Sequence, residues 1–372
     1  MPQEPFRKSF GIAGLFGLLT LALSTCSCAQ SEASRPANPS DMVMQSVRDY
    51  GRGHQSLLIP GTTEKPVEIG EAYSAHISKL TTEEEFAELE KIARQNRAEK
   101  SRVLGGVWKL YDFYEGAATP ESKGEPQVAD YALRVATLKK WIAAYPESAV
   151  PRLALAHLCI EHAWKIRGTQ YADEVSDSQW EKFEDGNSQG KAILLEAASL
   201  KDRDPMWYAF MQSIALSEGW DRPRARDLFD QAVAFEPGFY IFYRNYAIYL
   251  LPQWYGDPGD VSAFAEEVAH RVPDPDGSIF YFQILSSLAY NVPDSIAGLL
   301  RTSYPQLRQG YVNNTRLYGA SNLTANRFAF MASIFKDKPS AHDAFATLTK
   351  RETQIWGSDP TFDVLRDWAN TP

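Results

Sequence analysis

Cysteine is scarce in this sequence. The 372 residues include three cysteines, and two of them, Cys26 and Cys28, stand close to the N-terminus. Cys159 is therefore the single cysteine expected in the folded body, which excludes an internal disulfide framework. Its neighbours in Leu155–Ile160 are mostly apolar, and this favours a buried structural thiol over a catalytic nucleophile.

An excess of basic residues is also missing. The chain carries 38 Lys and Arg against 47 Asp and Glu, a net charge of −9, and its basic residues form no stripe. Proteins that bind nucleic acid neutralise its phosphates with clustered cations. We therefore expect no nucleic-acid partner.

Motifs that hold a phosphate, a calcium ion or a catalytic serine are absent. Gly51-Arg52-Gly53 lacks the third glycine and the preceding strand of a phosphate loop. Asp274-Pro275-Asp276-Gly277 resembles the start of a calcium loop, but no series of further ligands follows it. A Gly-x-Ser-x-Gly nucleophile elbow does not occur. The sequence predicts no cofactor.

The histidines do not form a zinc-binding pair. His157 and Glu161 are spaced to share one face of a helix, but His157 and His162 are five residues apart. On a helix these two side chains point about 140° away from each other, whereas zinc helices place two histidines four residues apart. We expect no metal site, and we interpret His157, Glu161 and His162 as polar residues on a helix surface.

The N-terminus has the pattern of an export signal. Arg7 and Lys8 precede the apolar run Phe10–Leu23, which is shorter than the roughly 20 residues of a membrane-spanning helix. Leu23-Ser24-Thr25-Cys26 resembles a lipoprotein signal, in which Cys26 is lipidated and becomes the mature N-terminus; the alternative is ordinary cleavage after Ala29. We expect an exported protein, either a periplasmic or membrane-anchored lipoprotein or a secreted one, with no membrane contact other than the lipid.

Composition divides the chain into three parts. Residues 1–29 are the signal, and residues 30–66, rich in Ser, Pro, Gly and Asn, are interpreted as a poorly ordered tether. Residues 67–372 contain apolar residues at helical spacing and no long run of alternating β-branched residues. The sequence therefore predicts an all-α domain over residues 67–372.

A spacing of 34 residues recurs within residues 205–251, the best-defined repeat of the chain. Positions in one helical segment reappear 34 residues later; they are Ala209, Gln212, Ser213 and Leu216, then Tyr243, Tyr246, Ala247 and Leu250. Between them lie Ala225, Phe229, Ala232 and Pro237, the small–aromatic–small–proline spacing of the second helix of a tetratricopeptide unit. The repeat predicts a tetratricopeptide-like array of antiparallel helix pairs, an α-solenoid.

The first helices of such units line a groove, and four positions of this chain are expected there. They are Phe210 and Ile214 in one unit, and Arg244 and Ile248 in the next, with Trp207 beside them. With one charged residue among the four, the groove is unsuited to clamping a carboxylate terminus and apolar enough to hold another helix. That helix comes either from a protein or peptide partner, whose acidic group Arg244 would bind, or from this chain itself.

An aromatic and acidic loop follows the repeat. Trp254 and Tyr255 begin the segment Trp254–Asp260, and loops on a rigid helical frame are frequent binding sites. We include both aromatic residues among the candidate binding residues. The alternative is that they cover helix ends, with Pro258 and Asp260 capping the next helix.

Several short segments within roughly residues 82–270 are distinctive in combination; they are Gly106–Tyr114, Ala163-Trp164, Arg167-Gly168, Tyr171-Ala172, Asp204–Tyr208, Gly219-Trp220 and Leu250–Gly256. In these segments the chain resembles a bacterial family of domains of unknown function, whose members look like exported proteins with tetratricopeptide-like helices. The family has no assigned activity, so the resemblance implies a fold and a compartment and no catalytic residue.

Two functions are compatible with these observations. The first, which we favour, is an interaction scaffold that binds a protein or peptide. The second is a helical carbohydrate-active enzyme, which needs two carboxylates roughly 5–9 Å apart in an aromatic-lined cleft. Its candidate residues are Glu181 beside Trp180, and Asp257 or Asp260 beside Trp254.

Overall fold

The computed structural model describes residues 70–371, except 123, 169–171, 287–300 and 357–358. Within this part of the chain the regular structure is helical; an isolated bridge between Arg102 and Trp108 is the nearest approach to a strand. The expected all-α class is confirmed. The expected signal, the tether and Cys26 lie outside the described residues. None of the described helices combines the length and apolarity needed to cross a membrane.

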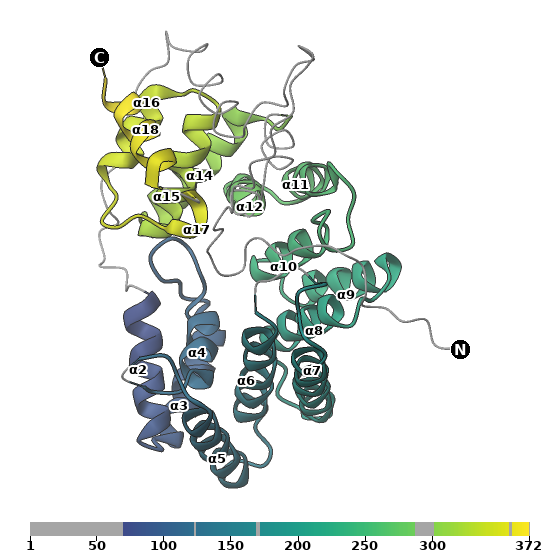
Figure 1. Ribbon diagram of the computed structural model, residues 1–372. Helices are drawn as coiled ribbons and strands as arrows, with labels where there is room; N and C mark the ends of the chain where they lie inside the picture. Colours follow the sequence, from purple (N-terminus) through teal and green to yellow (C-terminus); the bar gives the residue numbers. More distant parts are fainter. Residues whose placement is uncertain (1–69, 123, 169–171, 287–300, 357–358, 372) are drawn as a thin grey trace, which may run out of the picture.

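The helices follow one another with short connections (Figure 1). In chain order they are α2 (Gly70–Thr82), α3 (Phe86–Glu99), α4 (Lys109–Ala118), α5 (Val128–Ala144), α6 (Val150–Arg167), α7 (Asp177–Ala198), α8 (Pro205–Ser217), α9 (Arg222–Phe235), α10 (Ile241–Tyr249), α11 (Asp260–Arg271), α12 (Asp276–Ser286), α14 (Tyr304–Tyr318), α15 (Asn322–Ile334), α16 (Lys338–Ala346), α17 (Thr353–Trp356) and α18 (Asp359–Asn370).

The helices are arranged in two rows along a curve. Helices α4, α6, α8, α10 and α12 contact one another in this order and form what we call the inner row. Helices α7, α9 and α11 pack between successive members of the inner row, and α5 packs on α6 and α2; these four helices lie outside the inner row (Figure 1). Each helix therefore buries its apolar face mainly against its neighbours in sequence, as in proteins built by stacking small helical units.

The repeat detected in the sequence corresponds to α8, α9 and α10. Aspartate residues cap α8 and α9: Asp204 accepts a hydrogen bond from the backbone N–H of Met206, and Asp221 accepts one from that of Arg224. The small residues at the seam are buried; they are Ala209, Ala225, Ala232 and Ala247. The Phe229 ring stacks on Tyr246 with centroids 4.8 Å apart. The three helices expected between Trp207 and Leu251 are confirmed.

Helix α7 is continuous, although glycines at 186 and 190 interrupt its sequence. A Cβ atom at Gly186 would lie 2.8 Å from Cβ of Ala163, and one at Gly190 would lie 2.8 Å from Cγ1 of Ile160. Both glycines therefore let α7 pack closely on α6. Helix α4 begins only at Lys109, because Gly105 and Gly106 before it adopt positive φ angles of 89° and 88°.

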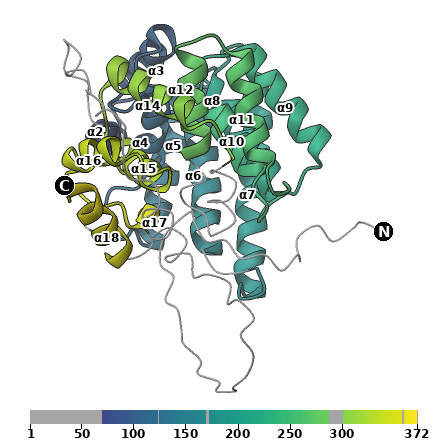
Figure 2. The same ribbon diagram turned by 90° about the horizontal axis from the view of Figure 1, so that it is seen from above.

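The loop before α4 connects the two ends of the described chain. The Gly105 carbonyl accepts a hydrogen bond of 3.0 Å from the Asn314 amide on α14. Gly105 also donates from its backbone N–H to the Gly319 carbonyl at 3.2 Å. Seen from above, the N-terminal helices α2–α4 lie beside α14–α16 (Figure 2). The curve of helices is therefore held at both ends.

Candidate functional site

Two pairs of polar residues at helical spacing project from neighbouring helices of the inner row. Tyr111 and Glu115 lie four residues apart on α4, and His157 and Glu161 lie four residues apart on α6. The spacing places each pair on one face of its helix, and α4 contacts α6 directly. We call these four residues, together with Arg244 of α10, the inner cluster.

His157 is at the centre of the inner cluster. Its side chain is buried, with 4% of the residue surface exposed, so the expectation that it is a surface residue is wrong. Nε2 lies 3.0 Å from Oε1 of Glu115, and Nδ1 lies 4.0 Å from Oε1 of Glu161. The ring stacks on Phe210 at 4.5 Å with an interplanar angle of 16°. His157 is buried because α8 covers it, which the α6 sequence alone does not reveal.

The two carboxyl groups differ in their electrostatic surroundings. Desolvation raises the pKa of Glu115, but the charge and hydrogen bond of His157, the Tyr111 hydroxyl and the charge of Arg244 outweigh it, so the net pKa is lowered. For Glu161, desolvation is larger than the attraction of His157 and Arg244, and its pKa is raised. The same region therefore favours an ionised Glu115 and a Glu161 that holds its proton more tightly than usual.

His157 responds to both carboxyl groups. Burial alone lowers the pKa of its imidazole, but the hydrogen-bonded Glu115 and the nearby Glu161 raise it above the ordinary value. The ionised Glu115 can only accept a hydrogen bond, so Nε2 of His157 carries a proton and donates it. The second ring nitrogen, Nδ1, has no hydrogen-bond partner among the described residues.

The groove residues expected from the sequence have different surroundings. Arg244 lies near Glu115 and Glu161, whose pKa values it lowers. Phe210 is 3% exposed and packs between His157 and Tyr114. Ile214 is fully buried, and Ile248 is partly buried. The chain itself already covers Phe210 and Ile214, so the binding role expected of these two residues would have to follow a rearrangement and stays a prediction.

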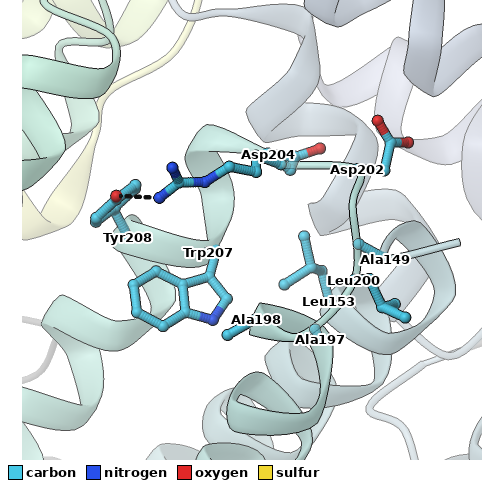
Figure 3. Close-up of a pocket in the computed structure, with 10 residues that line it drawn as sticks. Ala149, Leu153, Ala197, Ala198, Leu200, Asp202, Asp204, Trp207 and Tyr208 are labelled. Carbon is cyan, nitrogen blue, oxygen red and sulfur yellow. Dashed lines mark hydrogen bonds between the residues drawn. The ribbon is translucent and has the colours of Figure 1, made fainter.

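Trp207 lines a small pocket at the junction of α7 and α8, drawn in Figure 3. Its indole N–H donates to the Leu194 carbonyl at 2.8 Å. The pocket has a volume of about 70 Å³, well below the roughly 300 Å³ at which small-molecule sites begin. On its rim, Asp204 is buried and accepts hydrogen bonds from Arg97 and Tyr114. This arrangement joins α3 and α4 to the start of α8 and is structural.

Trp254 and Tyr255 contact helices of this chain. The Trp254 ring meets Trp164 edge to face at 5.6 Å. Tyr255 stacks on Tyr249 at 4.9 Å and donates from its hydroxyl to the Leu216 carbonyl at 3.1 Å. The two residues cover helix ends, which is the alternative that the sequence left open. Any further binding role stays a prediction.

The carboxylates proposed for an enzyme have different surroundings, and their pairing stays a prediction. Asp257 and Asp260 both pair with Arg222, and the Asp260 side chain also accepts a hydrogen bond from the backbone N–H of Asp257. Glu181 is exposed on α7. Two other glutamates, Glu115 and Glu161, flank a single imidazole, that of His157.

Cys159 lies in a depression of about 290 Å³ between α5, α6 and α7. Its side chain is partly buried, and burial raises the pKa of the thiol to about 11. A thiol with this pKa is almost entirely protonated at neutral pH and is a poor nucleophile. On the rim of the depression, the rings of Tyr131 and His162 stack at 3.8 Å.

The inner cluster can bind a polar ligand, and it can hold protons on two different groups. Among the described residues, no three His, Cys, Asp or Glu side chains are placed to hold a metal ion together. The sequence did not single out Tyr111 and Glu115 as candidate site residues, and it led us to interpret His157 and Glu161 as polar residues on a helix surface. One signal could have found these residues. They form two pairs of titratable side chains, each pair spaced four residues apart, on helices that a repeat would place side by side.

One family model matches the chain. Residues 74–226 match a family described as a domain of unknown function (DUF4034), which confirms the resemblance at that level. The match runs from α2 into α9 and includes the inner cluster apart from Arg244. The segment Leu250–Gly256, which contributed to the resemblance, lies beyond it. No curated protein and no solved structure matches the chain.

Proposed function

We propose that the protein is an exported, tetratricopeptide-like interaction scaffold that holds a segment of a partner protein against the inner cluster. One observation carries this proposal: charged side chains from three helices of one row lie close enough to affect one another. Glu115, on α4, and Glu161, on α6, are 33% and 51% exposed at their side chains, and the charge of Arg244, on α10, acts to lower the pKa of both.

The arrangement of the helices supports a right-handed solenoid of the tetratricopeptide type. The 34-residue spacing matches the length of such a unit, and the inner and outer rows alternate along the chain. In solenoids the curved inner surface is the usual binding surface. The partner contact that we propose is polar, because Phe210 and Ile214 are already buried within the array.

A peptide selection tests the scaffold function. A phage-displayed library of random 12-residue peptides is selected on the protein, and selected peptides are then measured against Glu161→Gln and, as a matched control on the outer row, Glu181→Gln. We expect the first variant to weaken binding by about tenfold and the control to bind as the wild type does. Peptides that bind both variants and the wild type equally would place the binding surface elsewhere.

Export is the second part of the proposal, and it rests on the N-terminal pattern. In a bacterial host grown with radioactive palmitate, we expect label on the wild type and none on Cys26→Ala. Loss of label in Cys28→Ala instead would move the lipid to that residue. An unlabelled wild type would contradict the lipoprotein and favour cleavage after Ala29.

A second candidate function is favoured by the opposite pKa shifts of Glu115 and Glu161. A carboxyl whose pKa is raised, close to one whose pKa is lowered, is an arrangement used in acid–base hydrolysis, including that of glycosidic bonds. A panel of oligosaccharides assayed for new reducing ends tests it. Hydrolysis that Glu161→Gln abolishes and Glu181→Gln leaves intact would support an enzyme; no hydrolysis of any member would leave the scaffold as the function.

A further inference from the structure

The starting observation is an unmatched nitrogen inside the inner cluster. His157 is more than nine-tenths buried, and its Nδ1 has no hydrogen-bond partner among the described residues. A buried polar atom without a partner costs free energy, on the order of 1–3 kcal/mol. Such an atom in a native structure needs an explanation, and a bound group that forms the missing hydrogen bond is one.

The carboxyl group of Glu161 lies on the same side of the imidazole as this nitrogen. It faces Nδ1 of His157 at 4.0 Å, which is too long for a direct hydrogen bond. Half of the side chain is accessible to solvent, yet it is surrounded by enough protein to be desolvated. A ligand in solvent can therefore reach the carboxyl group, and the surrounding protein balances its negative charge only in part.

We propose that Nδ1 of His157 and the carboxylate of Glu161 form a receptor for a primary ammonium group, such as a lysine side chain or an amino terminus of the partner. Two acceptors 4.0 Å apart can both lie about 2.9 Å from one nitrogen. An ammonium offers three donors, and its positive charge satisfies the Glu161 carboxylate. This inference rests on the proposed scaffold function and names the chemistry of its partner.

The stacked ring of Phe210 and the hydrogen bond to Glu115 orient the imidazole for this role. Because Nε2 donates to Glu115, the neutral imidazole has its lone pair on Nδ1. The Phe210 ring lies almost parallel to the imidazole at 4.5 Å and covers one of its faces. The only polar edge of the ring that remains for a ligand is the one facing Glu161.

The other charged groups near the receptor set its pH dependence. Glu115 and Tyr111 on α4 lie on the Nε2 side of the imidazole, and Arg244 on α10 brings a like charge that opposes an incoming cation. Asp112, next to Glu115 on α4, adds a further acidic group. An ammonium takes the place of a proton on Nδ1, so binding should tighten as the pH rises through the pKa of His157.

The test uses n-butylammonium as the probe and the nitrogen resonances of His157 as the readout. The protein is labelled with ¹⁵N-histidine, and the His157 signal is assigned by its loss in His157→Gln. We expect increasing n-butylammonium to shift the Nδ1 resonance to a saturating value and to lower the pH midpoint of the His157 titration. Tetramethylammonium, a cation without N–H donors, should do neither.

Variants link the effect to the receptor. Glu161→Gln should weaken n-butylammonium binding by about tenfold, and Glu181→Gln should leave it unchanged. Arg244→Gln removes the opposing charge and should tighten binding by about threefold. Helical circular dichroism of each variant confirms that it has folded, and Glu161→Asp provides a second acidic variant that keeps the charge and shortens the reach.

Two results would overturn the inference. In the first, n-butylammonium leaves the pH midpoint of the His157 titration unchanged. In the second, tetramethylammonium shifts this midpoint by the same amount, which would show a salt effect only. Neither result removes the scaffold function, because the peptide selection can still yield peptides without a basic group whose binding depends on Glu161. Conversely, n-butylammonium binding together with a failed peptide selection would keep the receptor and contradict the scaffold.

Discussion

The α8–α10 repeat and the α4–α6 contact have the same helix-on-helix arrangement but are held by different chemistry. In α8–α10, small and aromatic side chains fill the seam, as with Phe229 on Tyr246. Between α4 and α6, Glu115 and His157 bridge the helices with a hydrogen bond. The first region is held by apolar packing, whereas the second has charged groups at a contact between two helices.

The difference indicates where function resides in this fold. Replacing buried charged pairs by apolar residues of similar size is often neutral or stabilising, so stability alone does not explain Glu115, His157 and Glu161. Proteins depart from locally consistent sequence rules mainly at functional sites. This contrast is why we propose ligand binding at the inner cluster and structural support for the repeat.

The largest effect is expected at the residue that touches both regions. Phe210→Ala removes a ring that packs on His157 and Tyr114, and we expect it to lower the free energy of unfolding by about 3–5 kcal/mol, measured by urea denaturation. Leu195→Ala, at an exposed position of α7, is the control and should change little. An unchanged stability together with lost partner binding would instead mean that Phe210 is a docking residue.

The seam of the repeat is tested by overpacking. Ala232 is fully buried on α9, so Ala232→Leu should destabilise the protein by about 1–3 kcal/mol. Ala234→Leu adds the same side chain at an exposed position of the same helix and should be nearly neutral. If both variants are neutral, the seam is not close-packed and the contrast between the two regions is weaker than we describe.

The polar region should lose stability as the pH rises. Burial first, and then the charge of Glu115, raises the pKa of Asp112 to about 7, above the unfolded value near 3.9. Between these values the native state binds more protons than the unfolded state, so the free energy of unfolding falls from about pH 4 to about pH 7.

The variant Asp112→Asn removes this titration. Because Asp112 is partly exposed, we expect a gain over the wild type of about 1–2 kcal/mol at pH 8 and no gain at pH 4. Urea denaturation at the two pH values measures it, and Asp185→Asn at an exposed position of α7 is the control. An equal gain at both pH values would show that Asp112 acts through packing and not through its charge.

The smallest expected effect separates the two glutamates of the inner cluster. Glu115→Gln removes the charge that holds His157, and we expect a loss of about 1 kcal/mol at pH 7. Glu115 has a lowered pKa, so this loss should disappear as the pH falls through that pKa. Glu161→Gln should remain within about 0.5 kcal/mol of the wild type, because little compensates its charge. Equal losses would mean that both glutamates are structural.

The sequence was sufficient to predict the α8–α10 repeat, which is the apolar region of this comparison. The 34-residue spacing located α8–α10 because small and aromatic residues recur at fixed offsets there. It was insufficient for the loop before α4, since the positive φ angles of Gly105 and Gly106 depend on contacts with α14 some 200 residues away.

The sequence could not predict the inner cluster either, because its residues come together only when distant helices pack. Its residues are separated by up to 133 positions along the chain, from Tyr111 to Arg244, and only the packing of α4, α6, α8 and α10 brings them together. The burial of His157 depends on Phe210 of another helix. A pattern confined to one helix reports which side chains share a face, but it does not report what covers that face.

The most direct test of the account is the titration of the two glutamate carboxyl groups by ¹³C NMR. Spectra of Glu115→Gln and Glu161→Gln assign the two side-chain carboxyl carbons. The account predicts that the pKa of Glu161 lies above the ordinary value of a glutamate and that the pKa of Glu115 lies below it. Two glutamates that titrate together at the ordinary value would contradict it.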